Sequence, residues 1–188
     1  VGFFGVISNA TIKNLTITGA HITGKNYVGT VVGLSLGKTS TIINVHVASG
    51  SVKGVLGVGG LVGAAGTVSI NGYINIEGCS SDVEVSATGK YVGGLIGYLE
   101  GTIKGSYAIG TVQGDLYVGG LVGYSCGCTI ENCYSLSVIV GNNYVGGIVG
   151  YCAGSTTIIT TYFAGQITCK GTIYGGICAA VDNVVITN

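Results

Sequence analysis

The sequence predicts an all-β protein, a β-solenoid (β-helix) of about seven coils with three short strands in each coil. A four-residue apolar motif recurs at a period of roughly 29 residues, and a second short motif follows most of its copies. Valine, threonine and isoleucine dominate, with 37 glycines and no proline, and no 3.6-residue helical period persists. We therefore expect one repeat domain over residues 1–188.

The first motif, called here the anchor, reads Gly-Leu-Val-Gly at 60–63 and 120–123 and Gly-Leu-Ile-Gly at 94–97. With its looser copies it marks coils that start near residues 2, 30, 60, 94, 120, 147 and 176. The second motif is typified by Thr129-Ile130-Glu131-Asn132. A single coil cannot bury its own apolar face, so the coils must stack. We expect the segments near 60–64, 94–98, 120–124 and 147–151 to stack in register.

This register predicts sensible columns of side chains along the solenoid. Glu77, Lys104 and Glu131 form one column, in which opposite charges alternate as an exposed cross-strand ladder favours. Asn14, Asn44 and Asn132 share a corner column and tolerate left-handed backbone geometry. Ten of the twelve tyrosines fall into three columns: Tyr107, Tyr134 and Tyr162; Tyr98, Tyr124 and Tyr151; and Tyr27, Tyr91, Tyr117 and Tyr144. These columns are candidates for a packing face or a platform for sugar rings.

Composition argues against several classes of function. The formal net charge is zero, charged residues make up 7% of the chain, and all seven basic residues are lysines. A nucleic-acid partner requires a basic surface, and an anionic membrane surface attracts one. No apolar run reaches the ~18 residues of a membrane span. We expect no nucleic-acid binding and no membrane span, and the start at Val1 suggests a processed or excised piece.

No set of residues has the pattern of an active site. His21 and His46 occupy different columns, and the carboxylates are spread over several segments. Asp82 and Glu84 are expected to solvate an exposed strand rather than bind a cation. We therefore predict no catalytic residue, no metal site, no cofactor and no enzymatic activity.

The seven cysteines favour an oxidising, extracellular or cell-surface setting. Offsets within neighbouring coils predict a disulfide from Cys152 to Cys126 or to Cys128. Cys79 and Cys133 align two coils apart, beyond disulfide reach, and are expected to be buried thiols. Cys169 and Cys178 form a weaker candidate pair. The glycosylation candidates are Asn9 and Asn14, which begin Asn-Ala-Thr and Asn-Leu-Thr sequons.

The anchors at 60–63, 94–97 and 120–123, with Ala10-Thr11-Ile12-Lys13-Asn14-Leu15, resemble the GLUG-motif repeats of bacterial surface proteins. Such repeats occur in large adhesins and in IgA-protease-type metallopeptidases. The resemblance implies a stalk or display surface. The His-Glu-x-x-His zinc motif of those peptidases has no counterpart here.

We expect a structural repeat segment of an extracellular protein, an adhesin stalk or a filament subunit that self-assembles by coil stacking. The end coils carry no polar cap, and one residue of each apolar pair, such as Leu121 and Val122, is expected to point outwards. Another copy, or neighbouring coils of a longer chain, would then be the partner. The alternatives are a carbohydrate- or ligand-binding module that uses the tyrosine columns to bind glycans or a host surface, and a passive spacer beside a catalytic domain.

Overall fold

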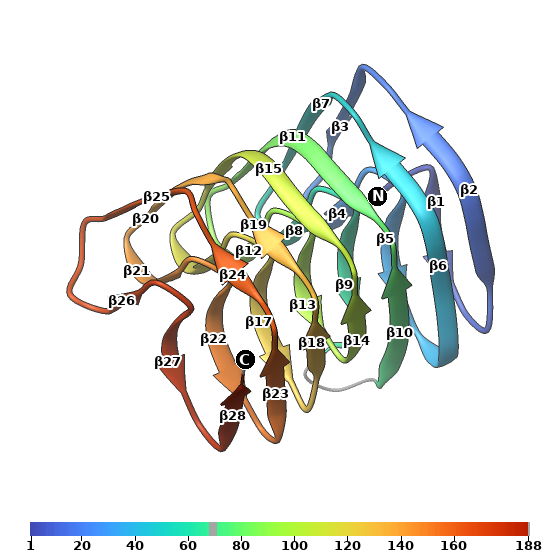
Figure 1. Cartoon of the computed structure of the whole chain (residues 1–188). Coiled ribbons are helices and arrows are strands. Elements are labelled where there is room, and N and C mark those ends of the chain that lie inside the picture. Colours follow the sequence, from blue (N-terminus) through green and yellow to red (C-terminus); the bar gives the residue numbers. More distant parts are fainter. Residues whose placement is uncertain (68–70, 188) are drawn as a thin grey trace.

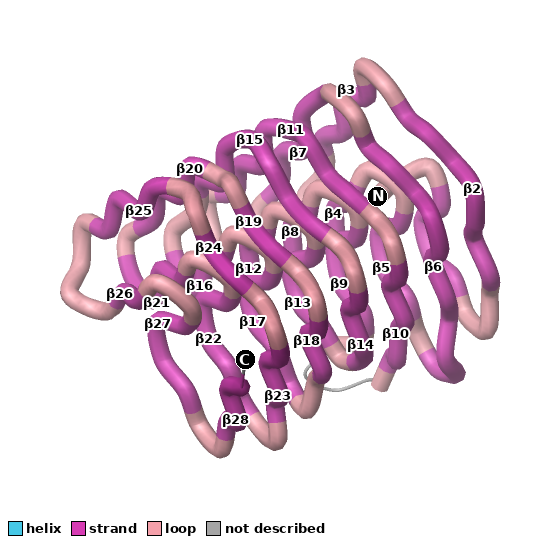
Figure 2. The backbone as a smooth tube through the Cα atoms, in the orientation of Figure 1, coloured by secondary structure: helices cyan, strands magenta, loops and turns pink. Residues whose placement is uncertain are grey.

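The computed structural model describes residues 1–67 and 71–187, and it is an all-β solenoid. The chain makes about six turns of roughly 28 residues, and three parallel sheets run along its length (Figure 1). Figure 2 shows that strands occupy most of every turn and that short loops form the corners. The predicted fold class is thereby confirmed. The seven predicted anchors lie along one sheet, and six turns separate the first from the last.

The sheet that carries the anchors is here called the anchor sheet. Every pair of neighbours in it is parallel and comes from consecutive turns, as the sequence predicts for 60–64, 94–98, 120–124 and 147–151. In spatial order its seven strands are β1 (Phe4–Ile7), β5 (Val32–Ser35), β9 (Val62–Ala65), β13 (Ile96–Leu99), β17 (Val122–Cys126), β22 (Val149–Ala153) and β27 (Cys178–Val181).

The second motif forms the first part of a broad sheet of 15 strands. The strands of this part are β2 (Thr11–Ile17), β6 (Gly37–Val47), β10 (Gly72–Glu77), β14 (Gly101–Lys104), β18 (Thr129–Glu131), β23 (Thr156–Ile159) and β28 (Val184–Thr187). The chain then continues through the rest of the same sheet in β3 (Ala20–Thr23), β7 (Gly50–Gly54), β11 (Ser80–Ala87), β15 (Tyr107–Gln113), β19 (Tyr134–Ser135), β20 (Val138–Gly141), β24 (Tyr162–Phe163) and β25 (Gln166–Cys169).

A short sheet of six strands precedes each anchor from the second coil onwards. Its strands end in Val-Gly or Tyr-Gly, and the chain turns from it directly into the anchor sheet. They are β4 (Asn26–Gly29), β8 (Leu56–Gly59), β12 (Lys90–Gly93), β16 (Leu116–Gly119), β21 (Asn143–Gly146) and β26 (Tyr174–Gly175).

The core is a set of apolar columns between these sheets. Leu61, Leu95 and Leu121 are fully buried at the corner between the short sheet and the anchor sheet. The expectation that one of Leu121 and Val122 points outwards is wrong, because both are 0% exposed. The two residues span the bend between β16 and β17, so the alternation of a straight strand does not apply to them.

Glycine is required at the anchor corner because backbones approach closely there. A Cβ atom on Gly119 would lie 1.9 Å from the Val122 carbonyl oxygen, and one on Gly120 would lie 2.4 Å from Ser135 Oγ. Neither residue has a positive φ. Close approach, rather than left-handed geometry, therefore explains the paired glycines of the motif.

Left-handed backbone recurs at several corners of the coil, and two of the columns that it forms contain residues singled out in the sequence. One contains Asn14, Asn44, Gly78, Gly105, Asn132 and Thr160, with φ between 43° and 60°. The asparagines of this column were expected from sequence, and their geometry is confirmed. The other column contains Tyr27, Gly57, Tyr91, Tyr117 and Tyr144, with φ between 52° and 65°. Left-handed tyrosine is costly, so the ring must gain packing that offsets the backbone strain.

Candidate binding surface

The most regular surface feature is a stack of tyrosine rings on the broad sheet. Tyr107, Tyr134 and Tyr162 are paired in register across β15, β19 and β24. Their ring centroids are 4.8 Å and 5.2 Å apart, with interplanar angles of 5° and 9°. The column continues into earlier coils through Ser80 and His46. The predicted column is thus formed as expected.

This stacking limits what the rings can bind. Each ring is parallel to the next at close to the strand spacing, so both faces of Tyr134 are covered by the rings of Tyr107 and Tyr162 and its edge points to solvent. A sugar ring stacks on an aromatic face rather than on an edge. Of these three tyrosines, Tyr162 at the end of the stack is the most exposed, at 55%. The expected platform is therefore reduced to the outer faces of the two end rings, Tyr162 and Tyr107. Tyr107 lines a depression together with Ser80 and His46.

The other two tyrosine columns interlock. Tyr98, Tyr124 and Tyr151 stack along the anchor sheet with centroids 5.4 Å apart and interplanar angles of 6°. Rings of the left-handed column contact them edge-on, and Tyr117 packs at 5.6 Å against Tyr124 and at 5.4 Å against Tyr151. Burial raises the pKa of Tyr98, and also those of Tyr117 and Tyr124. This cluster, called here the tyrosine zipper, is a packing device with little free ring surface.

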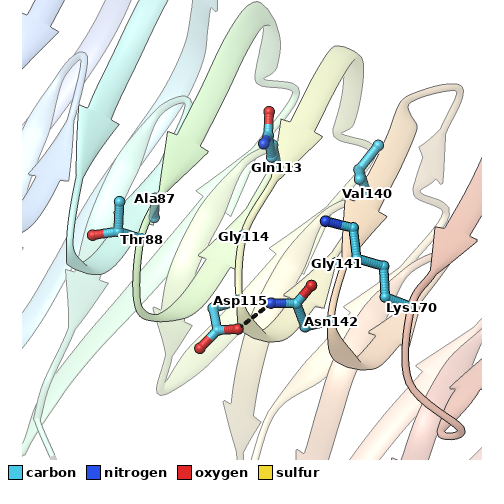
Figure 3. Close-up of a pocket in the computed structure, with 9 residues that line it drawn as sticks. All are labelled: Ala87, Thr88, Gln113, Gly114, Asp115, Val140, Gly141, Asn142 and Lys170. Atoms are coloured by element: carbon cyan, nitrogen blue, oxygen red, sulfur yellow. Dashed lines mark hydrogen bonds between the residues drawn. The ribbon is translucent and has the colours of Figure 1, made fainter.

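A polar groove follows the corner between the broad sheet and the short sheet. Figure 3 shows one part of it, the Asp115 depression, which has a volume of about 290 Å³ and is lined by Gln113, Asp115, Asn142 and Lys170 from successive coils. Adjoining depressions extend it past Ser86 to Lys53. The groove therefore runs across several coils rather than forming one closed pocket.

The chemistry of the groove suits hydrogen bonding rather than catalysis. Among the described residues that line the Asp115 depression, Asp115 is the one carboxylate, and its Oδ1 accepts a hydrogen bond from Asn142 Nδ2. Gln113 and Lys170 are exposed there and offer an amide and an ammonium group. Sequence reasoning missed this groove. Its signal is a column of mostly polar residues at the end of the third segment: Thr23, Lys53, Ser86, Gln113, Val140 and Thr168.

The histidines and carboxylates stay dispersed. His46 bonds Ser80 Oγ and Asn44 Oδ1, and His21 bonds Ser51 Oγ. Asp82 and Glu84 are exposed on β11 and lie opposite Ile109 and Thr111 of the next coil. Within residues 1–67 and 71–187, no three His, Cys, Asp or Glu side chains gather closely enough to hold a metal ion.

The charged column has the predicted register. Glu77 pairs with Lys104, and Lys104 pairs with Glu131 in the next coil. Lys104 Nζ lies 2.9 Å from Glu131 Oε2, and this contact raises the pKa of Lys104. Both side chains face solvent, so the ion pair adds little to stability.

The predicted disulfide from Cys152 to Cys126 or Cys128 is not formed, and all seven cysteines, each within the described ranges, are free thiols. Opposite Cys152 in the register lies Ser125, while half-buried Cys126 lies opposite Ala153. Buried Cys128 donates to the Leu99 carbonyl oxygen at 2.9 Å. The sulfur that contacts Cys152 Sγ is that of Cys178, at 3.0 Å. Cys178 is thus directed towards Cys152, not towards the suggested Cys169.

Cys79 and Cys133 are buried in the core, as the sequence predicts. Their thiols donate to the carbonyl oxygens of Glu77 and Glu131, and burial raises the pKa of Cys133 to about 11. Asn9 and Asn14, the glycosylation candidates, are exposed on left-handed corners. Asn14 Oδ1 accepts a hydrogen bond from Asn44 Nδ2.

Comparison with known protein families identifies the repeat. Residues 88–113 and 114–140 each match the GLUG motif, so the chain is a β-solenoid that contains GLUG repeats. The resemblance inferred from the anchors is thereby confirmed. Both matched segments begin just before a strand of the short sheet and include the anchor and the second motif that follow it.

Two individual proteins are similar to this chain. Halomucin of Haloquadratum walsbyi (strain DSM 16790 / HBSQ001) is 42% identical over 118 residues, which cover 52% of this chain and 1% of halomucin. The crystal structure of a putative immunoglobulin A1 protease from Bacteroides ovatus has the same fold, with a TM-score of 0.76 at 22% identity. That match covers 100% of this chain and 62% of the Bacteroides chain. The chain therefore spans less than two thirds of either protein. No described helix is both long and apolar enough to cross a membrane.

Proposed function

We propose that this chain is a structural, non-catalytic segment of an extracellular protein, in which stacked coils form a stiff shaft. The observation that carries the proposal is the continuity of register. All three sheets pair consecutive turns in parallel, so the same position lies above itself from coil to coil. Hydrogen bonds, apolar columns and tyrosine stacks all run along the axis, and they resist both bending and shear.

The end faces favour stacking against a further coil. At one end, β1 of the anchor sheet has one unpaired edge and exposes Phe4 and Val6, and Phe3 just before it is exposed too. At the other end, β27 and β28 are edge strands and expose Val181, Val185 and Ile186. Apolar parallel edges bind strands of matching geometry. Another coil is therefore the proposed occupant of each end, supplied by a second copy or by a longer chain.

The similarity to halomucin and the GLUG repeats support the proposal of an extracellular shaft. This chain matches 1% of halomucin, which fits a repeat unit inside a much longer protein. GLUG repeats in residues 88–140 fit the same interpretation. The dispersal of histidines and carboxylates among the described residues supports a role without catalysis.

Negative-stain microscopy and analytical ultracentrifugation of the purified 188-residue chain test the proposal. We expect end-to-end rods whose length grows with protein concentration, because each added copy buries one exposed end coil. A monodisperse 18.7 kDa species at high concentration would refute self-assembly by coil stacking. Compact round particles, or coils that bend freely against one another, would refute the proposal that the chain forms a stiff shaft.

The polar groove supports glycan binding as a second candidate function. It spans several coils and presents Gln113 and Lys170 to solvent, and a polysaccharide is a chain of sugar rings whose hydroxyl groups can bond such side chains at successive coils. A glycan array tests this candidate with the wild type and with Gln113→Ala. If Gln113→Ala abolishes glycan binding and Tyr162→Ala does not, the glycan binds in the groove. If only Tyr162→Ala abolishes binding, the glycan binds at the end of the tyrosine stack. An array without hits would remove the candidate.

A further inference from the structure

Seven thiols are distributed along the solenoid, and one pair differs from the others. The core thiols of Cys79, Cys128 and Cys133 each donate to backbone carbonyl oxygens. Cys152 and Cys178 instead face each other, with their sulfur atoms 3.0 Å apart. They come from β22 and β27, which are neighbours in the anchor sheet and belong to the last two coils described. A disulfide bond is about 2.05 Å long, so the sulfurs need to approach by about 1 Å.

We propose that Cys152 and Cys178 form a redox-controlled disulfide that fastens the last strand of the anchor sheet to the coil beneath it. β27 has a pairing partner on one side only, and its residues are more exposed than those of β22. It is the strand of this sheet that gains most from a covalent link at this end. The two cysteines are not paired in the register, since Cys178 lies opposite Val149 and Cys152 lies opposite Val181, and their sulfurs meet across this diagonal offset.

The protonation of the pair suits thiol–disulfide exchange. The hydrogen bond from Cys178 lowers the pKa of Cys152, and the same contact raises the pKa of Cys178. Of the two sulfurs, Cys152 therefore loses its proton more readily. Cys178 is half-buried and Cys152 is fully buried, so an external reagent reaches Cys178 first. One sulfur is accessible to the reagent, and the other has the lower pKa of the two.

The oxidant is a small-molecule disulfide such as oxidised glutathione. Cys152, as the thiolate, accepts the proton of Cys178 while the Cys178 sulfur attacks the small disulfide, forms a mixed disulfide and releases one small thiolate. That thiolate takes the proton from Cys152, and the Cys152 sulfur then attacks the Cys178 sulfur, forms the protein disulfide and expels a second small thiolate, which takes a proton from water. Two protein thiols are oxidised, one small disulfide is reduced to two thiols, and the protein loses two hydrogen atoms.

The full 188-residue chain, reduced and then treated with oxidised glutathione, tests the proposal by intact mass and non-reducing peptide mapping. We expect a loss of two hydrogens and a bond between the peptides of Cys152 and Cys178. Cys178→Ser and Cys152→Ser are expected to retain a glutathione adduct or to stay unmodified. Cys126→Ser, which removes a half-buried thiol opposite Ala153, is the matched control and is expected to behave as the wild type.

Amide hydrogen exchange on the same samples measures how strongly the disulfide restrains β27. Oxidation is expected to slow exchange of the β27 amides on the order of tenfold or more, because the link restrains local opening of the edge strand. The effect should be absent in Cys178→Ser. If a variant fails to fold, the mapped disulfide and the β27 exchange rates of the wild type, reduced and oxidised, are sufficient to test the proposal. The proposal is overturned if Cys152 and Cys178 both remain open to alkylation after oxidation and denaturation, or if either is bonded to another cysteine.

Discussion

Asn132 and Thr160 occupy the same left-handed corner in consecutive coils, with φ of 53° and 43°. Asparagine tolerates this conformation, whereas a β-branched residue is strained in it. Thr160 is exposed, so its side chain can be exchanged without disturbing the core. We predict that Thr160→Asn raises the free energy of unfolding by about 1 kcal/mol, measured by denaturant titration.

The reverse change provides the control for this corner. Asn132→Thr is expected to lower the free energy of unfolding by a similar amount, about 1 kcal/mol. Thr157→Asn, on regular strand β23, should not stabilise the protein. Equal stability of Thr160→Asn and the wild type would show that the corner column carries no strain.

The tyrosine zipper gives a second prediction, which separates the ring from its backbone. Tyr117 has a φ of 55°, and its ring contacts four other tyrosines: Tyr91, Tyr124, Tyr144 and Tyr151. Loss of the ring should destabilise the solenoid by about 3 kcal/mol. Glycine has no penalty for left-handed backbone, so Tyr117→Gly should be about 1 kcal/mol more stable than Tyr117→Ala.

Tyr134 provides the matched comparison for thermal or denaturant unfolding. It stacks with Tyr107 and Tyr162, but it lies in strand β19 without a positive φ. There the order should reverse, with Tyr134→Ala more stable than Tyr134→Gly by roughly 0.5–1 kcal/mol. The same order at both sites would contradict the role assigned to the left-handed column.

Close approach at the anchor corner gives a third prediction. A methyl group on Gly119 would lie 1.9 Å from a carbonyl oxygen of its own chain, and that backbone cannot move without breaking the pairing of β17. Gly119→Ala should therefore cost at least about 3 kcal/mol or prevent folding, as measured by circular dichroism and thermal melting. Gly5→Ala is the control, because no atom lies within 4 Å of its added methyl. A folded Gly119→Ala with wild-type stability would show that the sheets tolerate wider spacing.

Alkaline pH provides a fourth prediction. Burial in the zipper raises the pKa values of Tyr117 and Tyr124 above the ordinary value of 10.0. Below pH 10 these phenols are protonated in both folded and unfolded chains, so the stability from the raised pKa values is fully present. As pH rises further, the unfolded chain loses protons first, so stability falls until the folded pKa values are passed. Tyrosinate absorbance and unfolding free energy, followed together from pH 8 upwards, measure this.

Tyr124→Phe is the matched variant for the alkaline effect. It retains a ring that stacks on Tyr98 and Tyr151 but removes one ionising group. Its stability should fall less steeply above pH 10 than that of the wild type, while the two slopes should agree near pH 8. Identical slopes throughout would exclude Tyr124 from the alkaline transition.

Most of the fold follows from repetition in the sequence. The anchors and the Glu77–Lys104–Glu131 column determine which residues face each other, since a one-residue slip would reverse every face. Repetition also predicts buried Cys79 and Cys133 and all three tyrosine columns. What it misses lies where coils differ or bend. Leu121 and Val122 are both buried because the chain turns between them and the preceding strand.

The contact between Cys152 and Cys178 is a second feature that the repeat does not predict. Cys126 and Cys128 lie at offsets in the preceding coil similar to that of Cys152 in its own coil, and the repeat therefore predicts them as its partners. Its contact is Cys178, which replaces the column of valine and isoleucine inside the anchor and reaches Cys152 diagonally. The polar groove was missed for a related reason, since its residues are similar in polarity but not in identity: Lys53, Ser86, Gln113.

The exposed edge of β1 gives the last prediction, on assembly. Val6 is 64% exposed on β1, whose other side is paired with β5, so its substitution leaves the core intact. A lysine on an edge strand opposes pairing with another chain, because its charge would have to be desolvated. Val6→Lys should therefore shift the sedimentation profile of the 188-residue chain from rods towards an 18.7 kDa monomer with little loss of stability.

Val138→Lys is the matched control. Val138 is 41% exposed but lies on β20, which is paired on both sides with β15 and β25. It should assemble like the wild type if coils stack end to end. Dissociation by Val138→Lys with no effect of Val6→Lys would place the contact on the lateral face of the broad sheet, and would exclude coil stacking as the mode of assembly.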